Sequence, residues 1–394
     1  MNPSAPIDLH ISGHGPVALA LQAMLWTQGW DAAIHRTPTP PQPDASLRTR
    51  AIALSAGSLL LLRRCLRELP QGADIRTVEV QVADETKGLR LLARDLNLER
   101  LGRVVFLEEL LRAMSAPRGQ PAEDFRLPPD DSSARSSTSR PAPPLWTIQV
   151  QADGDPGTDA AIEDSGQSAL IAAVRCDHPP PAWALERFRS EGPLALLPDP
   201  RPGHLQVVWC APRALSEARL DRVRTDPEAA LRELGVALRC GIAPLAWAGP
   251  ASTAKLIRRA RRRLVEHDDA AHLSTVWIGN AAQILHPVAG QGLNLGLRDA
   301  AELARTLADL LALMRFRREP GAVRTALDSY AALRRSDRSF LLRLTDRLAS
   351  ATTGRIFQVL GPPCLRALQE LVPARRRAAS LFAFGPDAFL RPPG

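Results

Sequence analysis

The sequence predicts an α/β protein in which a parallel-sheet domain is assembled from separated segments, with an inserted mixed β-sheet domain and C-terminal helices. Three observations support this prediction. Residues 7–36 read as strand, Gly-rich turn, helix and strand. Residues 168–212 alternate short apolar runs with turn residues, and residues 276–304 read as strand, Gly-rich loop and long helix. The two strand-loop-helix segments flank the sheet segment, so we expect them to form one domain around an insertion.

The composition limits the choice of partners. The chain has 394 residues, enough for two or three domains, and a formal net charge of +8. Lysine occurs only at positions 87 and 255, so arginine carries nearly all of the positive charge. Nucleic acid or an anionic membrane surface fits this charge, and a coding bias explains it equally well. One tyrosine and nine phenylalanines leave few rings for stacking on bases, so no nucleic acid partner is expected.

The cysteines and the apolar runs indicate the compartment. The five cysteines show no C-x-x-C spacing and no paired framework, which is typical of a reduced cytoplasmic protein. The N-terminus has no signal pattern, and no apolar run reaches the roughly 20 residues that cross a bilayer. We therefore expect a cytoplasmic protein, with peripheral contact to the inner membrane as a further option.

The first strand and turn predict a dinucleotide site. Gly13, Gly15 and Ala18 form a G-x-G-x-x-A pattern after an apolar strand, and Pro16 stands where a helix best tolerates proline. The free N–H groups of the following helix attract a diphosphate. Alone this short pattern is weak evidence. Its position ahead of the segment at 279–300 strengthens it.

Two features depart from an intact dinucleotide site. The first strand alternates apolar Ile7, Leu9 and Ile11 with polar residues, whereas a strand buried on both faces is nearly all apolar. One face of the sheet should therefore be solvated. In addition, His35 and Arg36 stand where the second strand of such folds carries the carboxylate that accepts the ribose hydroxyls.

The segment at 279–300 predicts a site for a planar anionic group. Gly290 and Gly292 let the backbone lie flat against a ligand, and Pro287 fixes the approach of the loop. The helix that follows points its free N–H groups and positive end at this place. The alternative is a glycine-containing turn that only caps an amphipathic helix.

The ordered string from His286 to Ala300, HPVAGQGLNLGLRDA, resembles the C-terminal flavin motif of the FAD-dependent aromatic hydroxylases, in the ubiquinone-biosynthesis (UbiH-like) branch. The resemblance implies a Rossmann-like FAD-binding domain whose loop runs beside the isoalloxazine ring. In that family a preceding G-D dipeptide contacts the ribityl chain. Here the dipeptide is Gly279-Asn280, and Gln283 replaces a histidine. An amide oxygen still accepts a hydrogen bond, but it lacks the carboxylate's charge.

Two further segments carry the resemblance. The stretch RAIALS, beginning at Arg50, resembles R-x-x-A-L-S, which implies that Arg50 lies near the cofactor phosphates; the alternative is a surface arginine. Asp153-Gly154 resembles the start of A-D-G-x-x-S-x-x-R, with Gly157 and Ala160 at the Ser and Arg positions. The alternative for this dipeptide is a simple turn.

The resemblance predicts the site residues and the domains. The predicted cofactor-binding residues are Gly13, Gly15, Ala18, Arg50, Asp153, Gly154, Gly279, Asn280, Pro287, Gly290, Gln291, Gly292, Leu293 and Asn294. No side-chain acid or base and no metal ligand is predicted. The predicted domains are an FAD-binding part (1–114), a Pro/Ser-rich linker (115–144), an FAD-domain return strand (145–167), a β-sheet substrate domain with helices (168–270), a C-terminal FAD-binding part (271–350) and a helical tail (351–394).

The resemblance implies an FAD-dependent monooxygenase that uses NAD(P)H and O₂ to hydroxylate a polyprenyl phenol or quinone precursor in ubiquinone biosynthesis. The expected partners are an apolar aromatic or isoprenoid substrate, a multi-enzyme ubiquinone complex and a membrane surface. The alternative is a non-catalytic paralogue with weak or no FAD binding that acts as a scaffold or lipid-binding partner. Asn280, Gln283 and the missing ribose carboxylate favour the alternative, since each lost contact costs about 1 to 3 kcal/mol. The intact loop at 287–296 favours the enzyme.

Two basic segments are candidates for surface contacts. Residues 255–264 are rich in arginine, with apolar residues at helical spacing, and predict a helix with a solvated basic face. Acidic lipid or a partner protein is the alternative reading. Residues 375–384 place three arginines ahead of aromatic residues that look exposed, which predicts a segment for membrane or partner contact.

Overall fold

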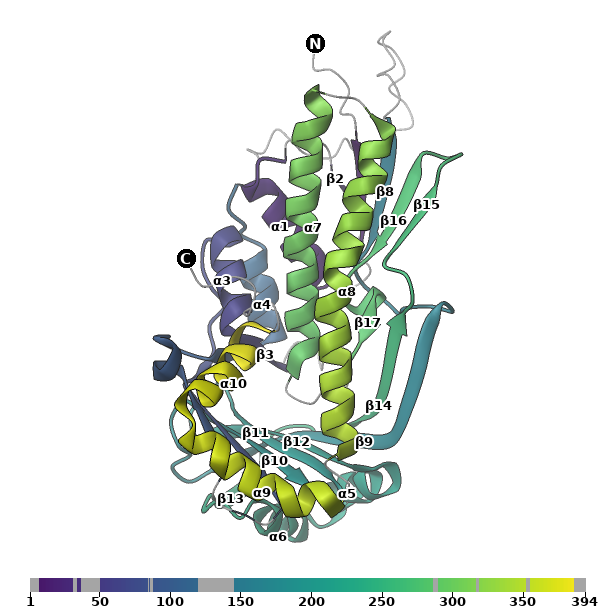
Figure 1. Ribbon diagram of the computed structural model, residues 1–394. Helices are drawn as coiled ribbons and strands as arrows, with labels where there is room; N and C mark the ends of the chain where they lie inside the picture. Colours follow the sequence, from purple (N-terminus) through teal and green to yellow (C-terminus); the bar gives the residue numbers. More distant parts are fainter. Residues whose placement is uncertain are drawn as a thin grey trace, which may run out of the picture.

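The computed structural model describes residues 7–30, 34–36, 50–83, 85, 88–119, 145–285, 290–316, 319–351 and 355–385. They form a parallel-sheet half at the top of Figure 1, a large mixed sheet below it, and a small sheet near their junction. This arrangement confirms the predicted α/β class. Most of the predicted linker, residues 120–144, lies outside the described residues.

The upper sheet brings together segments that are far apart in the chain. Its strand order is β15-β16-β8-β1-β2. β2, β1, β8 and β16 run parallel, and β15 pairs antiparallel with β16. The strands are β1 (Ile7–Ser12), β2 (Ile34–Arg36), β8 (Trp146–Gln151), β15 (Val265–Asp268) and β16 (Leu273–Trp277).

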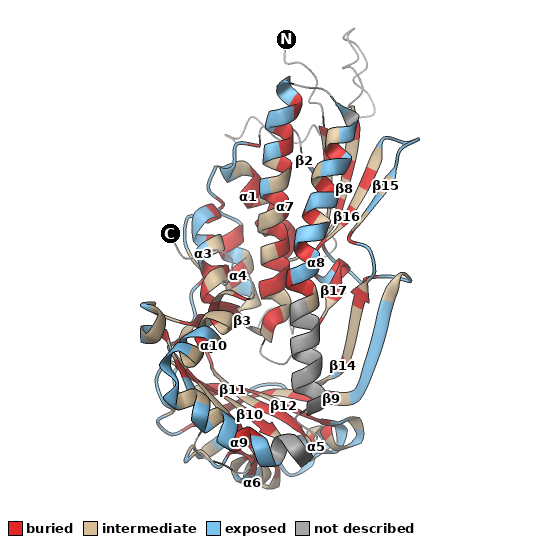
Figure 2. Ribbon diagram, in the orientation of Figure 1, coloured by how far each residue is buried: buried red, intermediate tan, exposed pale blue. Residues whose placement is uncertain are grey.

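One face of this sheet is apolar and the other is polar. Ile7, Leu9 and Ile11 are buried in the core that β1 shares with α1 and α7, whereas Asp8 and His10 on the opposite face are only half-buried. The predicted solvated face is thus confirmed. Buried residues line the inward side of α7 (Figure 2). The helices of this half are α1 (Pro16–Thr27), α3 (Ala56–Cys65), α4 (Leu107–Met114), α7 (Gln291–Phe316) and α8 (Pro320–Ala351).

The lower sheet has nine strands, and helices cover one of its faces. Its order is β17-β14-β9-β12-β11-β10-β5-β6, with β13 paired to β9. Leu170, Leu196 and Trp209 pack on this face with Leu234 of α6. The strands are β5 (Thr77–Val82), β6 (Leu89–Leu92), β9 (Ala160–Cys176), β10 (Trp183–Arg189), β11 (Gly192–Pro198), β12 (His204–Pro212), β13 (Pro244–Trp247), β14 (Ser252–Arg261) and β17 (Gln283–Ile284), and the helices are α5 (Arg213–Thr225) and α6 (Pro227–Leu238).

The remaining elements join the two halves. A three-stranded antiparallel sheet has the order β3-β7-β4. Helix α9 packs Leu365 against Val82 and Phe188, on the face of the lower sheet opposite α6. The elements are β3 (Ala51–Ser55), β4 (Ala73–Ile75), β7 (Gly102–Phe106), the 3₁₀ turns η1 (Ala93–Leu96) and η3 (Gly279–Ala281), and the helices α9 (Arg355–Glu370) and α10 (Val372–Phe384).

The structure corrects two boundaries. β5 and β6 belong to the nine-stranded sheet, although residues 1–114 were predicted to lie wholly in the FAD-binding part. β9 begins at Ala160 in the same sheet, inside the predicted return strand at 145–167. The sequence of a short strand does not reveal which sheet it joins, because its pairing partners are distant in the sequence.

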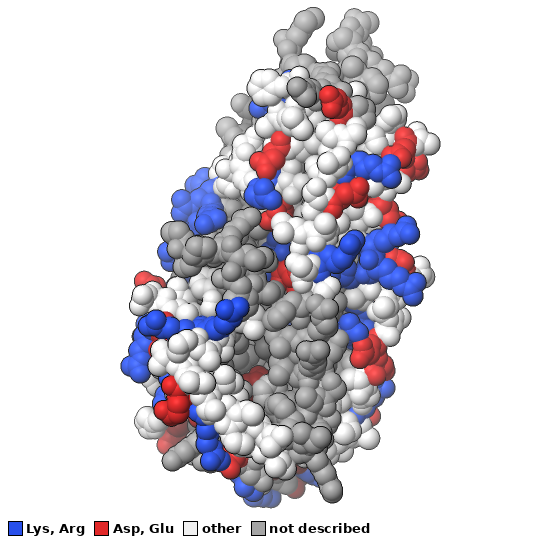
Figure 3. Space-filling model, viewed as in Figure 1, with Lys and Arg blue, Asp and Glu red and all other residues white. Residues whose placement is uncertain are grey.

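Both basic segments also differ from prediction. Most of residues 255–264 lie in strand β14, where Arg258 pairs with Glu163, Arg259 with Asp155 and Arg261 with Glu266. Figure 3 shows acidic and basic side chains interspersed on the visible face.

The tail segment is helix α10, but its aromatic residues are not exposed. Phe382 and Phe384 are half-buried and pack against a core that includes Ala379 and Ala383. Arg375 pairs with Asp95, with 2.9 Å between Nε and Oδ2. Among the described helices, none is both long and apolar enough to span a bilayer.

Candidate functional site

The predicted motifs meet at one edge of the parallel sheet. β1 ends at the Gly13 turn, β8 ends before Asp153, and β16 ends before Gly279. Because these strands are parallel and adjacent, their carboxyl ends share an edge, which is where open α/β sheets bind ligands.

Asp153 holds the first glycine turn. Its Oδ2 accepts hydrogen bonds from the backbone N–H of His14 and of Gly15, the latter at 2.6 Å. A Cβ on Gly15 would lie 2.7 Å from Asp153 Oδ1, and one on Gly13, whose φ is +135°, would lie 2.9 Å from Asp153 Cγ. A side chain at either position would collide with Asp153, so both glycines are needed for its carboxylate to approach the turn. Asp153 places a negative charge at the N-terminal end of α1, where a diphosphate was predicted.

The start of α7 packs closely against α1 and β16. A Cβ on Gly296 would lie 2.7 Å from Val17 Cγ2, and one on Gly279, whose φ is +57°, would lie 3.1 Å from the same side chain. Gly292 is different, since a Cβ there would meet no atom of the described residues within 4 Å. Open space at the first turn of α7 is what a planar ring beside the helix end requires. Gly290 has a φ of +59°.

Asn294 joins this turn to the RAIALS segment. Its Oδ1 accepts hydrogen bonds from Ser55 N at 2.9 Å and Ser58 Oγ at 2.7 Å. Its Nδ2 donates to the carbonyl oxygens of Ala53 at 3.0 Å and Gly290 at 2.9 Å. The side chain thus fixes the glycine loop against β3 and α3, so its role toward a cofactor is one of positioning the loop.

We expect Asn294→Ala to lower the free energy of unfolding by about 2 to 4 kcal/mol, because it removes the hydrogen bonds that this side chain makes to the buried N–H of Ser55, the buried hydroxyl of Ser58 and the half-buried carbonyl of Ala53. Urea unfolding followed by circular dichroism measures this. The matched control is Asn280→Ala in the same motif, where the side chain is exposed and the free energy should change by less than about 0.5 kcal/mol. Equal losses in both variants would contradict the role assigned to Asn294.

Gln283 and Asp299 form a network that the sequence pattern did not reveal. Asp299 Oδ2 accepts from Gln283 Nε2 at 2.8 Å and from Gly279 N at 3.3 Å. Asp299 Oδ1 accepts from Arg334 Nε at 2.8 Å, and Arg334 also contacts Asp337 at 2.6 Å. The network ties the strand end at Gly279 to α7 and α8. The only sequence signal was that Gln283 stands at the histidine position of the motif.

Burial and charge act in opposite directions on this network. Burial lowers the pKa of Arg334, but the charges of Asp299 and Asp337 outweigh it and raise that pKa. Burial raises the pKa of Asp337, but the charges of Arg298 and Arg334 outweigh it and leave the pKa below its usual range. Both groups therefore stay ionised in the folded chain.

The other predicted residues lie in different environments. Asn280 and Arg50 are exposed, so both side chains are available to a ligand. Ala18 is buried in the core under α1, and Leu293 packs against the same core. Gln291 is buried at the start of α7, and Gly154 adopts a φ of +101° beside Asp153. Pro287 lies outside the described residues.

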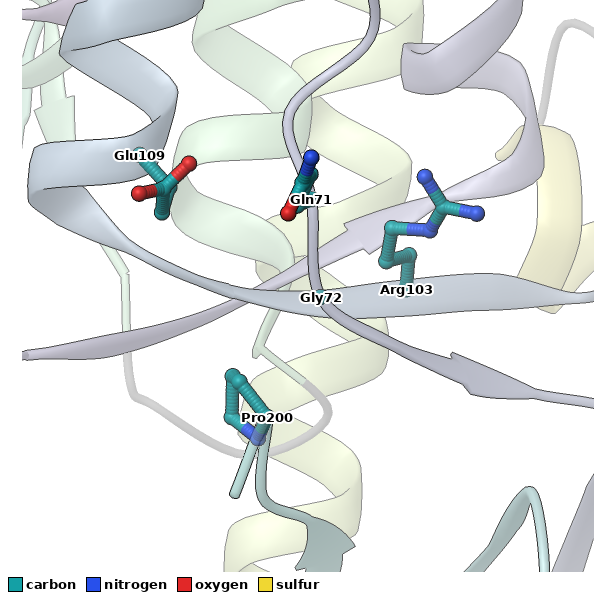
Figure 4. Close-up of a pocket in the computed structure, with 5 residues that line it drawn as sticks. All are labelled: Gln71, Gly72, Arg103, Glu109 and Pro200. Atoms are coloured by element: carbon teal, nitrogen blue, oxygen red, sulfur yellow. The ribbon is translucent and has the colours of Figure 1, made fainter. Parts of the chain in front are cut away.

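A separate cavity of about 460 Å³ lies near the small sheet (Figure 4). It is lined by Gln71, Gly72, Arg103, Glu109 and Pro200, none of which was predicted to bind the cofactor. Arg103 is held by Asp74, with 2.7 Å between Nε and Oδ1. This cavity plays no part in the site at the sheet edge.

Comparison with known proteins agrees with the sheet-edge geometry. The FAD binding domain family matches residues 269–338. Ubiquinone hydroxylase UbiL of Rhodospirillum rubrum is 36% identical over 184 residues, covering 46% of this chain and 39% of that protein. The match thus spans less than half of UbiL. The 3-demethoxyubiquinol 3-hydroxylase of Escherichia coli K12 is 27% identical over 335 residues, covering 77% of this chain and 80% of that protein.

Solved structures share the fold. The p-nitrophenol 4-monooxygenase PnpA from Pseudomonas putida matches with a TM-score of 0.64 at 15% identity, covering 96% of this chain and 97% of that one. A variant of Klebsiella pneumoniae HpxO complexed with FAD matches with a TM-score of 0.61 at 16% identity, covering 96% and 99%. The space at Gly292 among the described residues and the exposed side chain of Asn280 fit a flavin. The chain is therefore similar to the UbiH-like branch of the FAD-dependent aromatic hydroxylases, and the match to the FAD binding domain family together with the sheet-edge geometry supports FAD as the cofactor.

Proposed function

We propose that this protein is an FAD-dependent monooxygenase that hydroxylates an apolar phenolic ring, with NAD(P)H as reductant and O₂ as oxygen source. The observation that carries the proposal is the open space in front of Gly292 at the start of α7. This end of α7 is the one nearest the nine-stranded sheet (Figure 1). A flavin bound there supplies the redox and oxygen chemistry, while the chain orients the ring and excludes water.

The face of the nine-stranded sheet away from α5 and α6 supplies an apolar wall for the substrate. Cross-strand pairs place Val80, Glu186, Ala195, Val208 and Ile171 in one row across β5, β10, β11, β12 and β9. Four of these residues are apolar, which suits a ring with an isoprenoid substituent. Names of relatives such as UbiL and 3-demethoxyubiquinol 3-hydroxylase support a quinone precursor as that ring.

Glu186 is the carboxylate of this row and the group proposed to contact the ring hydroxyl. It is half-buried, and desolvation raises its pKa to about 7. Cys210 lies near it on the same face, and burial also raises the pKa of that thiol. An ionised Glu186 accepts the phenol proton, which makes the ring more electron-rich, and the carboxyl returns the proton to the hydroxylated product. A group with a pKa near neutral pH suits this exchange.

The visible absorbance of the purified chain, repeated after incubation with excess FAD and gel filtration, tests the proposal first. A retained flavin band, followed by NAD(P)H oxidation with phenols and gain of one oxygen atom in the product by mass spectrometry, supports the hydroxylase. A folded, colourless protein that cannot be loaded with FAD overturns it.

That second result would support a non-catalytic paralogue acting as a scaffold or lipid-binding partner. Two observations favour this alternative. Asp153 already occupies backbone amides at the start of α1, and Asn280 lacks the charge of the family's aspartate. Pull-down experiments for partners would then replace the activity assays.

For Glu186→Gln we expect kcat for a phenol to fall about tenfold to a thousandfold, because an amide cannot accept the proton. In the native chain kcat should rise as pH passes about 7 and Glu186 ionises, and this rise should disappear in the variant. The control is Glu228→Gln on α6, whose side chain is 86% exposed. Unchanged kcat and pH dependence in Glu186→Gln would remove Glu186 from the reaction.

A stability measurement checks Glu186 independently of activity. In the folded chain the pKa of Glu186 is about 7, above the ordinary glutamate value near 4.3. At any pH between these two values, unfolding therefore releases the proton of Glu186. The native chain should therefore lose stability relative to Glu186→Gln as pH rises through this window, with no further change above pH 8. A pH-independent difference in Tm between the two proteins would contradict the raised pKa.

A further inference from the structure

Two histidines and an aspartate meet on the polar face of the parallel sheet. Asp8 and His10 lie two residues apart on β1, so their side chains share one face. His35 on the edge strand β2 stands opposite His10 in the parallel register. The two imidazole rings stack with their centroids 4.7 Å apart and their planes 21° apart.

Both histidines turn the same nitrogen toward the one carboxylate. His10 Nε2 lies 2.9 Å from Asp8 Oδ2, and His35 Nε2 lies 3.1 Å from Asp8 Oδ1. The ligand atoms of the three side chains all lie within 4.8 Å of one another. The side chains of His10 and His35 are 43% and 47% exposed, so an ion reaches them from solvent.

These distances match those of a first-row metal site. Zinc bonds to nitrogen and oxygen are about 2.0 to 2.2 Å long, so neighbouring ligand atoms of a tetrahedral site lie about 3.3 Å apart. The nitrogen-oxygen distances here need to open by only a few tenths of an ångström. A donor set of two imidazoles and one carboxylate favours zinc and related ions over magnesium or calcium. Water completes the coordination sphere.

We propose that Asp8, His10 and His35 form a binding site for a divalent transition-metal ion such as Zn²⁺. The ion joins the short edge strand β2 to β1. β2 has only three residues and pairs with β1 alone among the described strands, so a metal bridge between His10 and His35 would stabilise its position. The proposal is tested without flavin, because the three side chains meet on the polar face of the sheet and reach one another directly.

The test is Zn²⁺ binding by the tag-free full chain in metal-free buffer, measured by competition with a chromogenic chelator. We expect one ion per chain with a Kd of about 10 µM or lower, and a rise in Tm with Zn²⁺ concentration. Co²⁺ should give a visible spectrum without thiolate charge-transfer bands. His10→Ala and His35→Ala should each weaken binding more than about tenfold while the far-ultraviolet circular dichroism stays unchanged.

The matched control is His178→Asn. His178 also lies beside an aspartate, with 2.6 Å between Nδ1 and Asp177 Oδ1, but the described part of the chain offers that pair no third ligand. Asparagine is chosen because residue 178 has a φ of +48°, which asparagine tolerates. This variant should bind Zn²⁺ like the native chain. Absence of binding at 100 µM Zn²⁺ (about ten times the expected Kd), or equal binding by the native chain and a His10→Ala/His35→Ala double variant, would overturn the proposal.

Discussion

Gly292→Leu should weaken FAD binding about a hundredfold and leave the chain folded. Among the residues that the structure describes, no atom lies within 4 Å of a Cβ at this position, so a leucine there meets no described neighbour near its Cβ. Leucine is also a better helix residue than glycine, which favours the fold. The side chain would instead occupy the space proposed for the flavin, and a hundredfold rise in Kd corresponds to about 2.7 kcal/mol. Flavin fluorescence titration measures Kd, and thermal unfolding without FAD measures the fold.

The matched control is Gly321→Leu. Gly321 lies at the start of α8, and a Cβ there also meets no described residue within 4 Å. This variant makes the same change at a helix start away from the sheet edge, so its FAD affinity should equal that of the native chain. If Gly292→Leu binds FAD as tightly as Gly321→Leu, the flavin does not lie at the start of α7.

Asp299→Ala should lower the free energy of unfolding by about 3 to 5 kcal/mol, because it removes one of the carboxylates that pair with the buried charge of Arg334. The side chains of Arg334 and Asp299 are 2% and 4% exposed, so water cannot replace the lost contact. Gln283 and the N–H of Gly279 lose the same acceptor. Urea unfolding measures the change, and FAD affinity should also fall because Gly279 is no longer held.

Asp309→Ala is the control within the same helix. Asp309 pairs with Arg305, but its side chain is 70% exposed, and such surface pairs contribute about 0 to 1 kcal/mol. Asp299→Asn separates charge from shape, since the amide keeps a hydrogen-bond acceptor but loses the charge opposite Arg334. A loss below about 1 kcal/mol in Asp299→Ala would show that this network contributes little to stability.

Local patterns predicted several elements correctly. The alternation of β1 predicted one buried and one solvated face, and both are present. The strand, turn, helix and strand predicted at 7–36 agree with β1, α1 and β2. These features depend on side-chain period and on the conformational needs of glycine, which are properties of a short stretch of chain.

The basic run at 255–264 shows where local patterns fail. Leu256 and Ala260 are four residues apart, and this spacing puts two side chains on one face in a strand as well as in a helix. Pairing with β9 makes this segment a strand and not a helix, and acidic residues of neighbouring segments neutralise its arginines. The sequence contains these acidic residues, but only the fold places them beside β14.

The sequence by itself determined the fold class and the resemblance to the flavin hydroxylases, because the glycine patterns at 13–18 and 279–300 lie in contiguous residues. Only the tertiary structure decided which partner each polar group meets. It placed Asp153 against the first glycine turn, used Asn294 to hold the loop, and brought Glu186 onto an apolar sheet face. It also brought His35 beside His10. The physical reason is that hydrogen bonds, burial and charge pairing depend on distances between atoms, and those distances join residues far apart in the chain.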